Sequence, residues 1–287
     1  MPDICVVHLV RKKNGTELFR IFLESYLNHQ AGTEHTLLII YKGFSGKSDV
    51  AAYENLLEGI PHTCLFLSDI GFDLRPYFIA ARKSESKYLC FLNSFCVILD
   101  DNWLLKLYTH IEKPGVGLVG ATGSWGSVGP GPVTTQKTLP LWKKVLRPLA
   151  WRLVARYLKL YFSPFPNPHI RTNGFMISND NMRNIRHGFI FAKMHAFRLE
   201  SGKNSITNQI KKMGLNVILV GKDGLGFEEN QWHLSNTFWT QTQSNLLIAD
   251  NQTRRFEAAD SPTRSFLENF AWGRAASMLR SNEPSGS

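Results

Sequence analysis

The chain has 287 residues, of which 43% are apolar and 20% charged, and it carries a formal net charge of +10. This length suits one large domain or a domain with an elaboration, and the composition excludes an intrinsically disordered protein. The four cysteines form no Cys-x-x-Cys pair and have no histidine at zinc-finger spacing, so we expect reduced thiols.

Targeting signals are the next feature of the sequence. The first residues, MPDICVVHLVRKK, show no basic region ahead of an apolar one, so we expect no signal peptide. No apolar run approaches the roughly 18 residues that a membrane-spanning helix needs. The sequence therefore predicts a cytoplasmic protein.

The first 120 residues alternate between two hydrophobic patterns. Short apolar runs predict strands at 4–10, 36–41, 63–67, 88–92 and 116–119. Apolar residues at helical spacing predict helices at 17–28, 49–58, 74–84 and 103–111. This alternation favours an α/β fold with a mostly parallel sheet and helices on both faces.

The middle of the chain carries nearly all of the excess positive charge. Of the 33 Lys and Arg residues, nine lie in the window 113–179, which has no carboxylate. The other 24 are nearly balanced by the 23 carboxylates in the rest of the chain. Residues 121–140 predict a loop, since they are rich in Gly, Pro, Ser and Thr. From 146 to 161, apolar residues recur at steps of three and one, with Arg152, Arg156 and Lys159 on the opposite helical face.

This basic amphipathic segment, 140–162, leaves two interpretations open. Apolar side chains opposite a row of cations suit the surface of an anionic membrane. The alternative is a helix that packs on the rest of the protein and exposes an ordinary solvated face. Beyond it, the patterns predict a strand at 170–178 interrupted at Asn173, a helix at 205–213, a strand at 216–220 and a helix near 264–279.

The most informative stretch is 88–104, YLCFLNSFCVILDDNWL. An apolar strand ends there at Asn93 and Ser94, and ligands of open α/β sheets bind at such carboxyl ends. The stretch resembles the central segment of GT-A-fold glycosyltransferases of the family-2 type, in which a strand ends in a short acidic motif and a helix with a Trp-Leu pair follows. Here Ser94 and Phe95 stand where carboxylates would hold a metal.

The resemblance covers roughly residues 3–224, including 115–123, 173–182 and 193–224. In the family, an acidic residue at the start of the acceptor-side helix is the catalytic base, and Glu200 is nearest to that position. The Asp that commonly reads the nucleotide base is replaced by Tyr41-Lys42-Gly43. The resemblance divides the chain into a nucleotide-sugar-binding half (1–120), a loop with basic amphipathic helices (121–170), an acceptor-side half with the C-terminal region (171–280) and a polar tail (281–287).

The function implied by the resemblance is transfer of a sugar from a nucleotide-sugar donor, with UDP-sugars favoured, to a polysaccharide or lipid-linked glycan such as a lipopolysaccharide. The enzyme would work peripherally at the inner face of the cell membrane. Besides Glu200, the expected site residues are, for the donor, Arg11, Asp69, Asp73, Arg82, Asn93, Ser94, Arg171 and Lys203, and, for the acceptor, Trp125, Asn173 and His233.

Metal use and activity stay open at this point. A divalent cation, Mn²⁺ or Mg²⁺, is usual in the family, but without the acidic motif the leaving diphosphate can instead be stabilised by fixed cations. Asp100 and Asp101 either hold a displaced metal or cap the next helix. A catalytically inactive protein that binds a nucleotide sugar or glycan is the alternative function. Nucleic acid is a disfavoured partner, because no helix-turn-helix, RNP or zinc-finger pattern is present.

Overall fold

The computed structural model describes residues 2–127 and 152–273, and its centre is an eight-stranded sheet in the order β11-β10-β6-β9-β4-β1-β2-β3. The strands are β1 Ile4–Arg11, β2 Thr36–Lys42, β3 Thr63–Leu67, β4 Tyr88–Leu92, β6 Val116–Gly120, β9 Gly174–Ser178, β10 Asn216–Val220 and β11 Gly226–Phe227. The helices are α1 Gly15–Asn28, α2 Ala51–Leu56, α3 Leu74–Lys83, α4 Trp103–Ile111, α6 Asn179–Asn184, α7 Lys193–Ser201, α8 Ile206–Lys212, α9 Asn251–Glu257 and α10 Ser261–Trp272.

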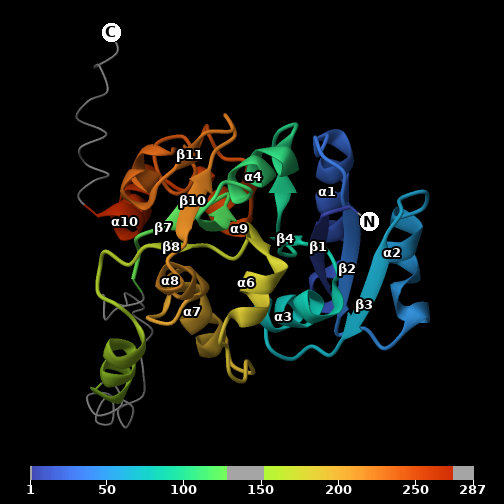
Figure 1. The fold of residues 1–287 in the computed structure, drawn as a ribbon, viewed down its shortest axis with the longest axis horizontal. Coiled ribbons are helices and arrows are strands. Elements are labelled where there is room, and N and C mark those ends of the chain that lie inside the picture. The colour runs from blue at the N-terminus through green and yellow to red at the C-terminus, as the bar shows by residue number, and fades with distance from the viewer. Residues whose placement is uncertain (1, 128–151, 274–287) are drawn as a thin grey trace.

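Most neighbouring strands of the sheet run parallel. β1 pairs in parallel with both β2 and β4, β2 with β3, and β6 with β10. β9 lies between β4 and β6 and is antiparallel to both, and β11 is antiparallel to β10. In Figure 1, β3, β2, β1 and β4 follow one another from right to left. The predicted α/β fold with a mostly parallel sheet flanked by helices is therefore confirmed.

Two separate cores pack on the two faces of this sheet. Successive side chains of a strand point to opposite faces, so Val6 packs with Phe22 of α1, while its neighbour Val7 packs with Tyr77 of α3. Helices α1, α2 and α4 cover the first face, and α3, α6, α8 and α10 contribute to the second core. Burial on both faces explains why the central strands are almost continuously apolar in sequence.

Two small antiparallel sheets and three 3₁₀ turns complete the described chain. β5 (Val97–Ile98) pairs with β12 (Ile248–Ala249), and β7 (Gly123–Ser124) pairs with β8 (His169–Ile170). The 3₁₀ turns are η1 Lys12–Asn14, η2 Lys47–Val50 and η3 Glu229–Leu234. The pairing of β5 with β12 holds the C-terminal region beside the end of β4.

The interruption expected at Asn173 is confirmed: the chain turns there between β8 and β9, and the Asn173 carbonyl oxygen accepts a hydrogen bond from the Asn93 amide (3.2 Å). The second half differs from its predicted elements in two places. Helix α9 has no predicted counterpart. The helix expected at 264–279 begins earlier, at Ser261, and its described part ends at Trp272.

The amphipathic segment is described only in part, since 128–151 lie outside the described residues. Residues 152–161 form a helix, seen in yellow-green at the lower left of Figure 1. Leu158 is buried, whereas Leu153 is 64% exposed and Val154 44% exposed. Within 2–127 and 152–273, no helix is both long and apolar enough to span a membrane.

Candidate functional site at the carboxyl edge of the sheet

The site begins at the point where the strand order reverses. β2 and β3 extend the sheet on one side of β1, and β4 lies on the other side. Ligands of doubly wound sheets bind outside the carboxyl ends of the strands at such a switch point. Here the Ser94 hydroxyl, just after β4, donates a 2.7 Å hydrogen bond to the Leu9 carbonyl oxygen of β1, which fixes the two strand ends together.

A cluster of cations around one carboxylate occupies this edge. Arg11, at the end of β1, donates two hydrogen bonds to Asp69, from Nε to Oδ1 (2.7 Å) and from Nη2 to Oδ2 (3.0 Å). Lys13 Nζ lies 3.1 Å and Lys42 Nζ 3.7 Å from the same carboxylate. These contacts, the Arg11 hydrogen bond above all, lower the pKa of Asp69 to about 2. Asp73 also lies within electrostatic reach of Arg11 and Lys42, so the cluster sets three cations against two carboxylates.

Lys42 is the least expected member of this cluster. It ends β2, its side chain is 1% exposed, and its Nζ donates a 2.7 Å hydrogen bond to the Phe72 carbonyl oxygen. Burial lowers the pKa of Lys42. The sequence pattern identified this position only as the replacement for a base-reading Asp. The signal that could have revealed a fixed cation here is a lysine at the end of an apolar strand.

Asp73, from the first half of the chain, lies close enough to Glu200, from the second half, for their charges to interact. Asp73 precedes α3, and its pKa is raised by burial and, to a smaller extent, by the negative charge of Glu200. Among the described residues, none donates a hydrogen bond to the Asp73 carboxylate. Glu200, in the last turn of α7, accepts hydrogen bonds at Oε1 from the Thr172 amide (3.1 Å) and hydroxyl (3.2 Å).

Tyr77 lies one helical turn after Asp73 and adds a third polar group. Its hydroxyl is buried and has no hydrogen-bond partner among the described residues. Burial raises the pKa of Tyr77, and the charges of Asp73 and Glu200 act in the same direction. Buried carboxyl and hydroxyl groups with raised pKa values are common at sites of proton transfer.

The polar side chains at the end of β4 form hydrogen bonds within the protein. Asn93 and Ser94 are 9% and 7% exposed. The Asn93 side-chain oxygen accepts a hydrogen bond from the Phe95 amide (2.9 Å), and the Ser94 hydroxyl is bonded to β1. The side-chain oxygen of Asn173 likewise accepts from the Thr122 hydroxyl (2.6 Å), but its amide nitrogen is buried and has no partner among the described residues. Asn173 therefore offers one unused hydrogen-bond donor beside the strand end.

A metal ion of the usual kind does not fit these residues. The oxygens of Asn93 and Ser94 are engaged, and Phe95 supplies no ligand atom. Asp100 contacts Lys106 and lies 3.8 Å from Lys222, and Asp101 accepts a 2.9 Å hydrogen bond from the Gln30 amide. In the described ranges, no three His, Cys, Asp or Glu side chains are grouped so that they could hold a metal ion.

Arg171 forms an internal ion pair. Its Nη2 lies 2.7 Å from Asp250, and the two side chains are 12% and 1% exposed. The guanidinium also stacks on Phe238, with 4.1 Å between the guanidinium carbon and the ring centroid. Asp250 caps the N-terminus of α9, so the pair holds the C-terminal region against the start of β9. No local pattern signals this partner, which lies 79 residues away along the chain.

Trp125 and His233, both expected at the acceptor, lie together. Their ring centroids are 5.0 Å apart, and the Trp125 indole nitrogen donates a 3.1 Å hydrogen bond to the Glu229 carbonyl oxygen. Burial lowers the pKa of His233, which favours its neutral form. This aromatic pair connects the β7 region with η3.

Two predicted donor contacts lie away from the carboxyl edge. Arg82 is in the last turn of α3, which returns to the amino edge of the sheet, and its Nη2 lies 3.3 Å from His187 Nε2. Lys203 follows α7 and donates a 2.8 Å hydrogen bond from Nζ to the Lys159 carbonyl oxygen. The structure brings neither residue to the cluster around Asp69.

Comparisons with known proteins found similarity to solved structures but no match by sequence. No model of a known protein family matches the chain. No curated protein sequence matches it either. Among solved structures, the chain is similar to the mannosyltransferase PcManGT from Pyrobaculum calidifontis, determined in complex with GDP-Man and Mn²⁺, with 13% identity, a TM-score of 0.49, and coverage of 100% of this chain and 76% of that one. Similarity at this level leaves ligand and activity to be inferred from the chain's own residues.

Proposed function

We propose that the chain is a glycosyltransferase that binds a nucleotide-sugar donor at the carboxyl edge of the sheet. The observation that supports this most strongly is the cation cluster of Arg11, Lys13 and Lys42 around Asp69, at the switch point between β1 and β4. A nucleoside diphosphate leaves with negative charge, and preorganised cations stabilise that charge in the transition state. The cluster takes over this task where the acidic motif of the family is missing.

The residues divide into a donor side and an acceptor side. On the donor side, the half-buried Arg11 and the exposed Lys13 bind the diphosphate, the buried Lys42 adds positive charge behind them, and Asp69 positions all three. On the acceptor side, Glu200 takes the proton from the acceptor hydroxyl as its oxygen attacks the anomeric carbon and the bond to the diphosphate breaks. Burial and the nearby negative charge of Glu200 raise the pKa of Asp73, and a carboxyl group with a raised pKa suits proton transfer.

The proposed acceptor is a polysaccharide or a lipid-linked glycan. Sugar rings stack on aromatic faces, and the Trp125–His233 pair offers such a surface. The unused amide donor of Asn173 suits a sugar hydroxyl near the strand end. We assign these three residues to the acceptor.

The helix at 152–161 supports a peripheral position on the cytoplasmic face of an anionic membrane. Leu153 and Val154 are exposed apolar side chains, and Arg152, Arg156 and Lys159 supply cations. Each cation near such a surface contributes about 1 kcal/mol to binding. This arrangement would bring a membrane-bound acceptor to the enzyme.

A thermal-shift screen against UDP-, GDP-, CMP- and dTDP-sugars, each with Mn²⁺ or with EDTA, tests the donor. A ligand that binds only the folded chain raises the melting temperature. We expect one nucleotide class, with UDP-sugars favoured, to raise it equally in both buffers. A shift that requires Mn²⁺ would contradict the role of the cation cluster, and no shift with any donor would contradict nucleotide-sugar binding.

One observation favours a second candidate function, an inactive nucleotide-sugar or glycan-binding protein. The side-chain oxygens of Asn93 and Ser94 already form hydrogen bonds within the chain, so they are not free to bind a reacting nucleotide sugar. Donor binding without turnover, for any acceptor tried, would support this alternative.

A further inference from the structure

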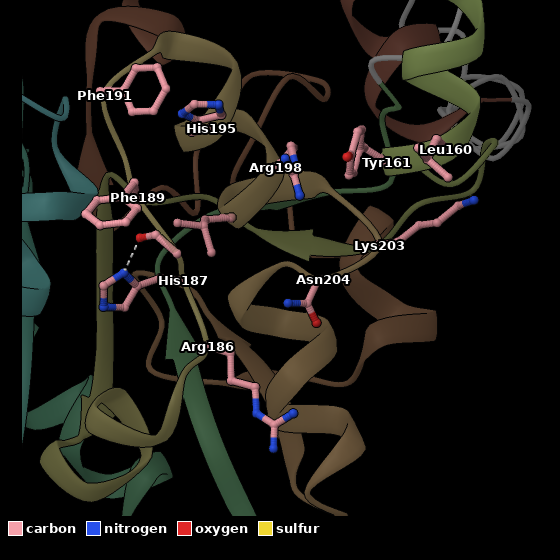
Figure 2. Close-up of a pocket in the computed structure, with 12 residues that line it drawn as sticks. Leu160, Tyr161, Arg186, His187, Phe189, Phe191, His195, Arg198, Lys203 and Asn204 are labelled. Carbon is pink, nitrogen blue, oxygen red and sulfur yellow. Dashed lines mark hydrogen bonds between the residues drawn. The ribbon is translucent and has the colours of Figure 1, made fainter.

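A second site lies on the other side of α7, in a cavity of about 550 Å³. Its walls are the end of the helix at 152–161, the segment 186–191 and the outer side of α7 with the turn that follows it. Figure 2 shows Phe189, Phe191 and His195 along one side and Arg198 with Tyr161 opposite them. The volume lies within the usual range for small-molecule pockets, about 300–1,000 Å³.

The Arg and Lys residues that line this cavity are not balanced by any acidic lining residue. Arg186, Arg198 and Lys203 line it, and its lining includes no Asp or Glu. Among the described residues, neither arginine forms an ion pair with a carboxylate. The Arg198 guanidinium carbon lies 3.6 Å from the Tyr161 ring centroid, so its position is fixed by stacking while its edge donors stay available. Planar arrays of arginine donors match phosphate oxygens.

Exposed apolar side chains surround these cations. Phe189 is 91% exposed, Phe191 68% and Leu160 61%. Large apolar side chains gathered beside a concave site indicate a ligand or interaction surface. The cavity therefore offers two chemistries side by side, cations for a phosphate and an apolar surface for a hydrocarbon.

Helix α7 separates this cavity from the carboxyl edge. Glu200 and Arg198 are two residues apart on the helix, which places them on roughly opposite sides of it. Glu200 bonds Thr172 at the sheet edge, and Arg198 lines the cavity. One short helix thus connects the proposed base with the proposed second site.

We propose that this cavity binds a phosphate or diphosphate attached to an apolar chain, as in the head of a lipid-linked acceptor. The inference rests on the proposed function and deepens it by naming the chemistry of the acceptor. Arg198 binds the phosphate oxygens, Arg186 and Lys203 add positive charge at the edges of the cavity, and Phe189, Phe191 and Leu160 contact the first part of the hydrocarbon. The amphipathic helix, whose end forms one wall, is placed to meet the membrane that carries such a lipid.

Isothermal titration of the full chain with geranyl diphosphate, inorganic pyrophosphate and geraniol tests the proposal. We expect geranyl diphosphate to bind more tightly than either fragment. The double variant Arg186→Gln/Arg198→Gln should weaken it roughly tenfold or more, since charged hydrogen bonds are lost. Phe189→Ser should weaken geranyl diphosphate but leave pyrophosphate unchanged.

The control is the double variant Lys212→Gln/Arg255→Gln, which also removes two positive charges, from exposed positions on α8 and α9. It should leave binding of geranyl diphosphate unchanged. Pyrophosphate binding as tightly as geranyl diphosphate would overturn the proposal, because the apolar surface would then have no role. Equal binding by the wild type and the folded double variant, or no binding at all, would overturn it as well.

A nucleotide-sugar thermal shift on the same proteins separates this inference from the proposed function. We expect the shift of the double variant to equal that of the wild type, which also shows that the variant is folded. Geranyl diphosphate binding without any nucleotide-sugar shift would contradict the donor proposal and support the cavity. The reverse result would overturn the cavity proposal alone.

Discussion

Asp69 is the residue on which the proposed donor site depends most directly. It is the shared partner of Arg11, Lys13 and Lys42, and its side chain is only 23% exposed. Without it, three cations would repel one another at the sheet edge. The carboxylate therefore has a structural role that is separate from any contact with the donor.

Replacing Asp69 with Asn should lower the free energy of unfolding by about 2 kcal/mol at pH 7. The folded state lowers the pKa of Asp69 to about 2, so its contribution is present above the unfolded value, near 4, and is lost as the pH falls through 2. Urea denaturation of both proteins at pH 7, 4 and 3 measures the difference. A difference that stays constant down to pH 3 would contradict the ion-pair account. Asp180→Asn, an exposed carboxylate on α6, is the control and should show little change.

For single residues, the sequence predicted which side chains lie near the sheet edge better than it predicted the partners they contact. Arg11, Asp69 and Asp73 were expected at the site because polar residues after apolar strands meet at one edge of a parallel sheet, and Glu200 was expected there from the family resemblance. Their partners are long-range and could not be derived. Arg82 shows the limit most clearly, since it lies about two and a half turns after Asp73 on α3 and so is carried away from the carboxyl edge.

The C-terminal elements are held to the sheet by the Arg171–Asp250 ion pair. Both side chains are nearly buried, and Asp250 also caps α9. Breaking a buried pair by removing one charge is costly, because the other charge stays buried and uncompensated. The pair therefore connects the start of β9 with α9 and with the strand β12 that precedes it.

The variant Asp250→Asn isolates this ion pair, because asparagine caps a helix about as well as aspartate. We expect it to lower the free energy of unfolding by about 3 kcal/mol. Asp260→Asn is the matched control, since Asp260 caps α10 but is exposed and has no ion-pair partner among the described residues. Chemical denaturation measures both variants. Equal, small losses for the two would show that the Arg171–Asp250 pair does not hold α9.

Elements with strong periodicity were predicted closely, and those fixed by tertiary contacts were not. β3, β4, β10 and α4 have the bounds expected from their patterns. Helix α9 was missed because it is short and its start depends on the Asp250 cap rather than on an apolar stripe. The break between β8 and β9 was expected from Asn173 and Gly174 in the sequence, whereas the contact of Asn173 with Asn93 that accompanies it is long-range and has no local signal.

For the whole molecule, the uneven charge predicts binding to anionic membranes. Sedimentation with phosphatidylglycerol-containing vesicles should carry the protein down, and raised salt or neutral vesicles should reduce this binding. The triple variant Arg152→Gln/Arg156→Gln/Lys159→Gln should weaken it most. Replacing Lys211, Lys212 and Arg255 with Gln removes equal charge elsewhere and is the control. Equal loss by both variants would contradict docking through the helix at 152–161.

The central claim is that fixed cations, rather than an acidic metal site, support glycosyl transfer at the carboxyl edge. The most direct test is turnover of the donor found by thermal shift, measured in EDTA for the wild type, Arg11→Gln and Arg255→Gln. We predict turnover by the wild type in EDTA, a loss of about 100-fold in kcat for Arg11→Gln, and no change for Arg255→Gln. Turnover that needs Mn²⁺, or that is equal in all three proteins, would contradict the claim.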